Sequence, residues 1–248
     1  MLKENLHIHS SYSWDSKLEI KKTVEIAKKA SFDIVAITDH VELDETILSI
    51  ILKYSHLSSR YNEIEDLKQD LVILHGLEIS EPHLRTRDLI MLKDLPIDII
   101  LGSIHDINKK EKEEEKIIQA YKTYYTKVKQ SVEAGNFDVL AHLGYIDKYY
   151  NYNFKEKELI DEILKEIIKK EIALEINTSG LRRKTNPTFP KIEIIERYKE
   201  LGGKKVTIGS DAHRESEIDD NIDLAYDIAK ELKLEIGIFK RRKWKKIN

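Results

Sequence analysis

The sequence predicts an α/β fold in which parallel strands form a barrel, and three observations support this prediction. Short apolar runs alternate along the chain with longer segments whose apolar residues recur at helical spacing. The chain has 248 residues, a length at which barrel folds occur as a single domain. Only four Pro and nine Gly are present, and no linker rich in Pro, Ser or Gly divides the chain. We therefore expect one barrel domain that spans residues 1–248.

Seven apolar runs have the length and composition of strands. They cover residues 5–8, 32–38, 71–77, 97–102, 137–141, 172–176 and 205–209. An eighth run of this kind follows at residues 234–239. An open, doubly wound sheet is the structural alternative, but no G-x-G-x-x-G motif follows the first run.

Helices are expected between most of these strands, because parallel neighbours need a crossover connection. The segments with a helical pattern are residues 17–30, 114–134, 155–170, 190–201 and 218–232. In residues 155–170 the apolar side chains fall on one face of a helix with 3.6 residues per turn. They are Leu159, Ile160, Ile163, Leu164, Ile167 and Ile168.

Composition and charge exclude several classes of protein. The 42 basic and 45 acidic residues are interspersed and give a net charge of −3, so we expect no nucleic-acid or membrane partner. The first residues lack the apolar region of a secretory signal, and no stretch approaches the ~18 apolar residues of a membrane helix. We therefore expect a cytoplasmic protein. The absence of Cys excludes disulfides, iron–sulfur clusters and a cysteine nucleophile, and any metal must bind through nitrogen and oxygen.

Potential metal ligands follow nearly every predicted strand at its carboxyl end. In chain order they are His7, His9, Asp39, His40, Glu78, His105, His142, Glu175, Asn177, Asp211 and His213. The carboxyl ends of barrel strands lie on one face, where active sites of this architecture are built. His7 and His9 are two residues apart, so both point to the same side of a strand. Six imidazoles and several carboxylates exceed the three or four ligands of one catalytic zinc, so we expect two or three metal ions.

Several of these residues have ordinary explanations when taken alone. Asp39 or Asp211 could cap a helix, for example. Such explanations do not account for the recurrence of a potential metal ligand at the same position after six strands. This recurrence favours a joint metal site. The remaining histidines fall outside the pattern: we expect His56 on a helix surface and His75 in a strand or the core. His83 lies in a loop, where it is either an ordinary residue or a substrate contact.

Six strings carry a resemblance to a known family. LHIHSSYSWD, ITDH, GLEIS, GSIHD, AHLGYID and GSDAHR resemble, in this order, the successive motifs of the PHP (polymerase and histidinol phosphatase) family. The resemblance implies a distorted (β/α)7 TIM-like barrel with a trinuclear metal centre at the carboxyl ends of the strands. Zn, Mn and Fe all suit nitrogen and oxygen ligands of this kind.

The family pattern also implies how the ligands are shared among three metals. The first metal would be held by His7, His9, Glu78 and Asp211. Glu78 would bridge to the second metal, which His105 and His142 complete. The third metal would be held by His40, His213 and Asp15.

Two further strings indicate a phosphatase within this family. EINTSGLRRK (residues 175–184) and EIGIFKRRKW (residues 235–244) resemble the standalone histidinol-phosphate phosphatases. The resemblance implies a phosphomonoesterase that converts L-histidinol phosphate to L-histidinol and phosphate, a step of histidine biosynthesis. Asp106 departs from the pattern, which has an aromatic residue after the GSIH string. The terminal run KRRKWKK is expected to be a solvated end.

Substrate contacts are expected from residues near the same motifs. Arg182 or Arg183 would bind the phosphate, because a guanidinium group matches phosphate oxygens in geometry and charge. Asn177 and His83 are further candidates for substrate contact. The leaving group needs a proton or a metal contact, which His213 or a water molecule would supply.

Three alternative functions remain open at this stage. A phosphodiesterase or nucleotide phosphatase of the same family would use the same ligands with another pocket. An amidohydrolase also begins with H-x-H on a barrel, but it usually has a carboxylated Lys where this chain has Glu78. A non-catalytic metal- or phosphate-binding module is disfavoured by the intact ligand set. The expected partner is a small phosphate ester, and the sequence does not indicate an oligomeric state.

Overall fold

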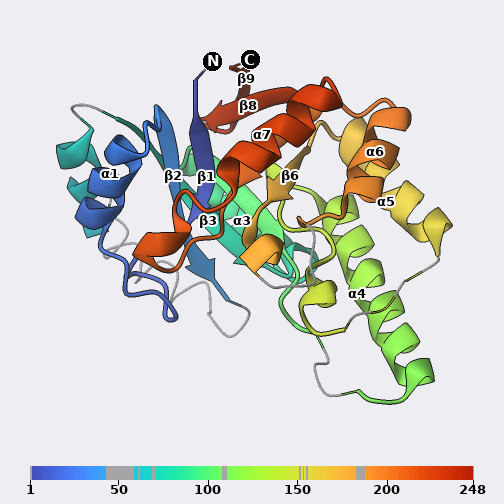
Figure 1. The fold of residues 1–248 in the computed structure, drawn as a ribbon. Coiled ribbons are helices and arrows are strands. Elements are labelled where there is room, and N and C mark those ends of the chain that lie inside the picture. Colours follow the sequence, from blue (N-terminus) through green and yellow to red (C-terminus); the bar gives the residue numbers. More distant parts are fainter. Residues whose placement is uncertain are drawn as a thin grey trace.

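The structure, a computed structural model, describes residues 2–42, 59–60, 62–68, 71–107, 111–150, 152, 154, 156–182 and 188–247. Within these residues one sheet contains nine strands, and their order in the sheet follows their order in the chain (Figure 1). The strands are β1 (Glu4–Ile8), β2 (Ile34–Val41), β3 (Val72–Ser80), β4 (Ile99–Ser103), β5 (Val139–Leu140), β6 (Ala173–Asn177), β7 (Lys205–Gly209), β8 (Glu235–Lys240) and β9 (Lys243–Lys246). All eight predicted strands are present. β1 to β8 pair in parallel, and β9 pairs antiparallel with β8.

Helices connect the parallel strands, as the pattern of apolar residues predicted. The five expected helices are α1 (Ile20–Lys29), α4 (Glu114–Ala134), α5 (Lys157–Lys169), α6 (Ile192–Glu200) and α7 (Ile222–Glu231). The short helix α3 (Thr86–Met91) was not predicted. Helix α1 covers one side of the barrel, and α4, α5 and α6 cover another (Figure 1). No helix among the described residues is both long and apolar enough to cross a membrane. His56 lies outside the described residues.

Apolar side chains form two separate clusters on the two faces of the strands. The larger cluster lies between strands and helices and includes Ile37, Leu77 and Ile163. The smaller one fills the inside of the barrel from alternate strand positions. Its strand members include Leu6, Ile34, Ala36, Leu74, Ile99, Leu101, Val139 and Ala173, and Ala141 directly follows β5. The barrel is therefore a packed core, and its carboxyl-end face is left for polar residues.

A bulge in β1 changes which side chains face the inside of the barrel. Leu6 belongs to the inner cluster, whereas Ile8, two residues later, belongs to the outer cluster. The pairing register between β1 and β2 shifts between Asn5 and Ile8. Such a bulge reverses the alternation of side chains. It brings His7 and His9 to the inner side, while Ile8 faces the helix layer as expected.

The first parallel strand closes the barrel by contacting the chain just after β7. His9 donates its backbone N–H to the carbonyl of Ala212 at 2.9 Å, and Ile8 and Ala212 form a parallel bridge. The Nδ2 of Asn5 donates to Ser210 Oγ at 2.7 Å. These contacts join the first and last parts of the barrel at its carboxyl-end face.

The C-terminal hairpin lies at the opposite end of the barrel. Arg242 donates to Asp138 Oδ2, just before β5, at 2.7 Å. Trp244 packs against Phe239 with ring centroids 5.2 Å apart. The expectation of a solvated end is therefore only partly right. The lysines of β9 are exposed, but their backbone pairs with β8.

Glu4 is a buried carboxyl group in β1, far along the strand from the histidines. Its side chain is 0% exposed, and Oε1 accepts the backbone N–H of Ile208 at 3.2 Å. Its Oε2 has no hydrogen-bond partner among the described residues. Burial raises the pKa of Glu4 well above its ordinary value of 4.5, because the charged form is poorly solvated there.

Replacing Glu4 with Gln is expected to stabilise the protein at neutral pH and to have little effect near pH 4.5. Because the folded-state pKa is raised, the unfolded state releases this proton first, and the wild type loses stability as pH rises. At pH 7.5 we expect Glu4→Gln to increase the free energy of unfolding by about 1–3 kcal/mol. Urea denaturation of both proteins at the two pH values measures the difference. A difference that does not change with pH would contradict this account.

Candidate metal centre

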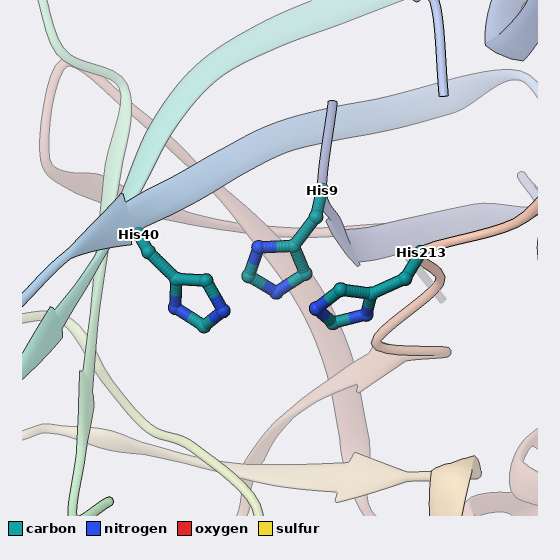
Figure 2. A group of neighbouring side chains, drawn as sticks. All are labelled: His9, His40 and His213. Atoms are coloured by element: carbon teal, nitrogen blue, oxygen red, sulfur yellow. The ribbon is translucent and has the colours of Figure 1, made fainter. Parts of the chain in front are cut away.

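The expected ligands gather at the carboxyl ends of the strands. They come from β1, β2, β3 and from the loops that follow β1, β4, β5 and β7. Figure 2 shows the rings of His9, His40 and His213 side by side, with His9 in the middle. The His9 ring centroid is 4.1 Å from each of the other two. Three segments far apart in the sequence therefore present imidazoles to one point.

The carboxylate of Glu78 lies at the centre of this cluster and is 1% exposed. Its Oε1 is 2.7 Å from His142 Nε2 and 3.3 Å from His105 Nε2. Its Oε2 is 3.5 Å from the Nε2 atoms of both His7 and His9. The two carboxylate oxygens thus face different imidazoles, with His40 Nδ1 also 2.9 Å from Oε2, which is the arrangement that a bridging ligand needs.

Two aspartates complete the groups that the sequence predicted. Asp211 Oδ1 lies 3.2 Å from His9 Nε2 and 3.6 Å from His7 Nε2. Asp15 Oδ2 lies 3.2 Å from His213 Nε2 and 3.5 Å from His40 Nε2. The residues of the three expected sets therefore lie in one cluster, but the groups of ligand atoms within 4.8 Å of one another are composed differently: His9 joins His40 and His213, and His7 joins Glu78 and His142. How the ligands are shared among ions stays a prediction.

The pKa values of these groups reflect burial set against opposite charge. Burial alone would lower the pKa of His7, but the carboxylates of Glu175, Glu78 and Asp211 outweigh it and raise the pKa well above 6.5. Burial would raise the pKa of Glu78, yet the surrounding histidines hold it well below its ordinary value. His9 differs, because burial and the neighbouring His40 lower its pKa to about 4. The carboxylates at the centre are therefore in the charged form that binds cations.

The donor set fits divalent metal ions. Glu78 Oε2 lies 2.9 Å from His40 Nδ1 but makes no hydrogen bond within the described part of the chain. A buried carboxylate oxygen in this state is costly unless a cation occupies the space beside it. Groups of three ligand atoms within 4.8 Å of one another include His7–His9–Asp211, His7–Glu78–His142 and His9–His40–His213. Imidazole nitrogen and carboxylate oxygen suit zinc, manganese and iron.

Glu175 was expected as a possible ligand but instead holds two of the histidines from behind. Its Oε1 accepts a hydrogen bond from His7 Nδ1 at 2.8 Å, and its Oε2 accepts the backbone N–H of His142 at 2.7 Å. The first bond directs His7 Nε2, which lies 3.1 Å from His9 Nε2, toward the centre, where it could bind a metal. Gly209 permits this close packing, because a Cβ there would lie 2.1 Å from Glu175 Oε1 and 2.6 Å from His7 Cβ.

Asp39 also lies behind the centre. It accepts hydrogen bonds from the backbone N–H of Ser10 at 2.6 Å, from Ser13 Oγ at 2.7 Å and from the buried Arg60 at 2.7 Å. Ser13 Oγ is in turn 3.2 Å from His9 Nδ1. Asp39 lies within β2 and is therefore not a helix cap. It orders the β1 loop that carries the ligands.

The expected substrate residues have other partners in this structure. Arg182 donates to the carbonyl groups of Asp211 and Glu217, both at 3.3 Å, and to that of Ser210. Asn177 is fully buried, and its amide bonds Glu175 and Ser179. Their contact with substrate stays a prediction.

The remaining residues that the sequence singled out are His83, Arg183 and His75. His83 Nδ1 lies 2.8 Å from Ser131 Oγ on α4. Arg183 lies outside the described residues. His75 is buried within β3, in agreement with the role in a strand or the core that was expected for it.

Four residues near the centre were not found from the sequence. Glu42 Oε1 lies 3.2 Å from His105 Nδ1, and Glu81 accepts the backbone N–H of His105 at 2.7 Å. The Tyr145 ring is 4.8 Å from that of His142, and Lys148 donates to the Tyr145 hydroxyl. Only Glu42 had a signal, because a residue two positions after His40 lies on the same face of β2.

Three of the ten non-glycine residues with positive φ in the described part of the chain lie at this site. His142 and Asp211 have positive φ values of 26° and 53°, and Glu81 has a φ of 45°. Side chains other than glycine are disfavoured there, and such residues often lie at functional sites. The hydrogen bond from His142 N to Glu175 helps to hold one of them in place.

Comparison with known proteins agrees with this geometry. The model of the PHP domain family matches residues 5–179. A probable histidinol-phosphatase of Clostridium acetobutylicum is 30% identical, with 95% of this chain and 96% of the relative covered. A probable histidinol-phosphatase of Thermotoga maritima is 33% identical, with 92% and 91% covered.

A solved structure has the same fold over nearly its whole length. It is the histidinol phosphate phosphatase of Lactococcus lactis, crystallised with zinc, L-histidinol and phosphate. Its TM-score is 0.78 at 23% identity, with 98% of each chain covered, so the likeness concerns the fold. The barrel-type α/β fold with parallel strands that was expected from the sequence is thereby confirmed, and eight strands, β1 to β8, pair in parallel. From the family match and the two relatives, the chain belongs to the PHP domain family.

Proposed function

We propose that this protein is a metal-dependent phosphatase that hydrolyses L-histidinol phosphate to L-histidinol and phosphate. The observation that carries the proposal is the convergence of six imidazoles with Glu78, Asp211 and Asp15 at one end of the barrel. Two relatives named probable histidinol-phosphatase and one named histidinol-phosphatase support the choice of substrate. Such a reaction belongs to histidine biosynthesis, and a role of this kind would place the enzyme in the cytoplasm.

The proposed cofactor is two or three divalent ions of zinc, manganese or iron. His7, His9, Glu78 and Asp211 would hold the first, Glu78 with His105 and His142 the second, and His40, His213 and Asp15 the third. Bound there, the ions would supply a hydroxide nucleophile at neutral pH and neutralise charge on the phosphate oxygens. The structure of the relative with zinc bound supports zinc as one suitable ion.

Residues of the chain itself would bind the phosphate and help to protonate the leaving group. Arg182 lies against the carbonyl of Asp211, so its guanidinium is close to the first metal group. Lys148 lies 4.5 Å above the Tyr145 ring, which packs against His142 near the second group. The two cations would therefore approach the phosphate from different sides. A water molecule or His213 would protonate the leaving alkoxide, and His213 could do so only while its Nε2, which faces Asp15, does not hold the third ion.

Removal and return of metal tests the reaction and the substrate together. We expect chelated protein to release no phosphate from L-histidinol phosphate, and zinc or manganese to restore release. AMP, phosphotyrosine and short DNA serve as competing substrates in the same assay. Metal-loaded protein that ignores L-histidinol phosphate but cleaves one of the others would overturn the substrate assignment and leave the centre intact.

Two substitutions test how the ligands are shared. We expect Glu78→Gln to lose at least two equivalents of bound metal, because Glu78 faces both the first and the second group. His142→Ala should lose one equivalent, because His142 Nε2 faces only the second. Elemental analysis after dialysis gives the counts, circular dichroism checks the fold, and Glu133→Gln on the exposed side of α4 is the control. Equal metal content in all three variants would contradict the ligand assignment.

Replacing each of the two cations tests whether it binds the phosphate of the substrate. A charged hydrogen bond contributes about 1.5–3 kcal/mol, so we expect Arg182→Ala and Lys148→Ala each to raise KM about 10- to 100-fold with unchanged metal content. Arg197→Ala, whose side chain pairs with Asp161 on the outer face, is the matched control. Loss of metal in Arg182→Ala would instead mean that Arg182 only orders the loop containing Asp211.

A further inference from the structure

His105 is the least enclosed of the proposed second-metal ligands. Its side chain is 19% exposed, whereas those of His142 and Glu78 are 2% and 1% exposed. It lies in the loop that follows β4 rather than in the strand itself. A ligand in this position needs other groups to fix both its backbone and its ring.

The ring of His105 is held by Glu42. Glu42 Oε1 lies 3.2 Å from His105 Nδ1, while the other ring nitrogen, Nε2, faces Glu78 Oε1 at 3.3 Å. A hydrogen bond from Nδ1–H to a carboxylate fixes the tautomer, sets the ring orientation and increases the basicity of Nε2. Glu42 is itself fixed, because the buried Arg85 donates to its backbone carbonyl and also bonds Asp88.

The backbone of His105 is held by Glu81. Glu81 Oε1 accepts the backbone N–H groups of His105 at 2.7 Å and of Asp106 at 2.8 Å. Its side chain is buried, and its own N–H donates to the carbonyl of Ser103 at 2.9 Å. The positive φ of Glu81 costs conformational energy, which these bonds offset. Because the carboxylate spans two consecutive N–H groups, it fixes the direction in which His105 leaves the strand.

Other ligands of the same centre are held in the same two ways. Glu175 accepts the ring Nδ1–H of His7 and the backbone N–H of His142. Glu217 Oε2 accepts the backbone N–H of His213 at 2.8 Å. At His105 the ring contact and the backbone contact come from two carboxylates on two neighbouring strand ends.

We propose that Glu42 and Glu81 are positioning residues of the second metal site, which hold the ring and the backbone of His105 so that its Nε2 reaches the ion bound by Glu78 and His142. The assignment rests on the proposed metal centre. Glu42 Oε1 also lies 3.4 Å from His40 Nδ1, and Glu42, His40 and His105 form a further group of ligand atoms within 4.8 Å of one another. In this assignment Glu42 and Glu81 act through His105 and are not themselves ligands.

Zinc titration of the chelated protein tests the assignment without reference to activity. We expect Glu42→Ala and Glu81→Ala each to weaken one zinc equivalent about 10- to 100-fold and to leave the others unchanged. Glu81→Gln should remain within about 3-fold of wild type, because its amide oxygen still accepts both N–H groups. Glu42→Gln should fall between wild type and Glu42→Ala, because the hydrogen bond remains but the negative charge is lost.

Cobalt-loaded protein and steady-state kinetics provide independent measurements. A displaced His105 should change the visible absorption of one cobalt equivalent in the two alanine variants. With saturating metal, kcat should fall while KM for L-histidinol phosphate changes little, because neither residue is assigned a substrate contact.

Asp98→Asn is the matched control for Glu81. Asp98 accepts the backbone N–H groups of His75 at 3.1 Å and Arg241 at 3.0 Å, so it has the same kind of role at the other end of the barrel. The control should lose thermal stability and keep its zinc affinity. If Glu81→Ala does not fold, the two Glu42 variants and Glu81→Gln still decide the result.

Three results would overturn the assignment in distinguishable ways. Wild-type zinc affinity in both Glu42→Ala and folded Glu81→Ala would exclude positioning while leaving the metal centre intact. Loss of a whole equivalent from Glu42→Gln at saturating zinc would make Glu42 a direct ligand. A wild-type protein that binds no zinc, manganese or iron would overturn the proposed centre together with this assignment.

Discussion

The buried carboxylate of Glu78 is the interaction on which the rest of the site depends. A charge at 1% exposure would be strongly destabilising without partners, and here five histidines from four segments surround it. Each of those histidines needs its own partner to stay in position. The carboxylates of Asp39, Glu175, Glu217 and, as proposed, Glu42 and Glu81 therefore form an outer layer. The position of Glu78 therefore depends on the histidines, and the positions of the histidines depend on these carboxylates and on the loops that carry them.

Much of the fold could be predicted because burial leaves a clear pattern in the sequence. The eight strands and five helices were found where apolar residues repeat with the appropriate period. Strand β9 was missed because Lys243–Lys246 contains three lysines, and its pairing depends on β8 rather than on apolar burial. Helix α3 was missed because six residues are too few for a helical period. The β1 bulge has no sequence signal, although it determines which way His7 points.

The proposed ligands of the candidate site could be predicted from the sequence better than the residues that hold them. Residues such as Glu78 and His40 follow strand ends, and parallel topology brings such ends together whatever the details of the loops. Asp39 and Glu175 have the same placement, yet they turn to Ser10 and His7 instead of the centre. The pattern could not separate ligands from the residues that hold them. Lys148 lies in a short 3-10 helix, Tyr145–Lys148, which is too short for a period to relate sequence to direction.

The contacts that join β1 to the chain after β7, called the seam here, limit the order in which the protein can fold. Asn5 and Ser210 are hydrogen-bonded although they are 205 residues apart. Closing so long a loop costs more entropy than any local contact in the barrel. His7 and His9 lie on one side of this seam, and Asp211 and His213 lie on the other. During synthesis, a chain emerging from the ribosome cannot present the complete ligand set until β7 has been made. An ion bound by residues on both sides of the seam would then stabilise the fold only at a late stage of folding.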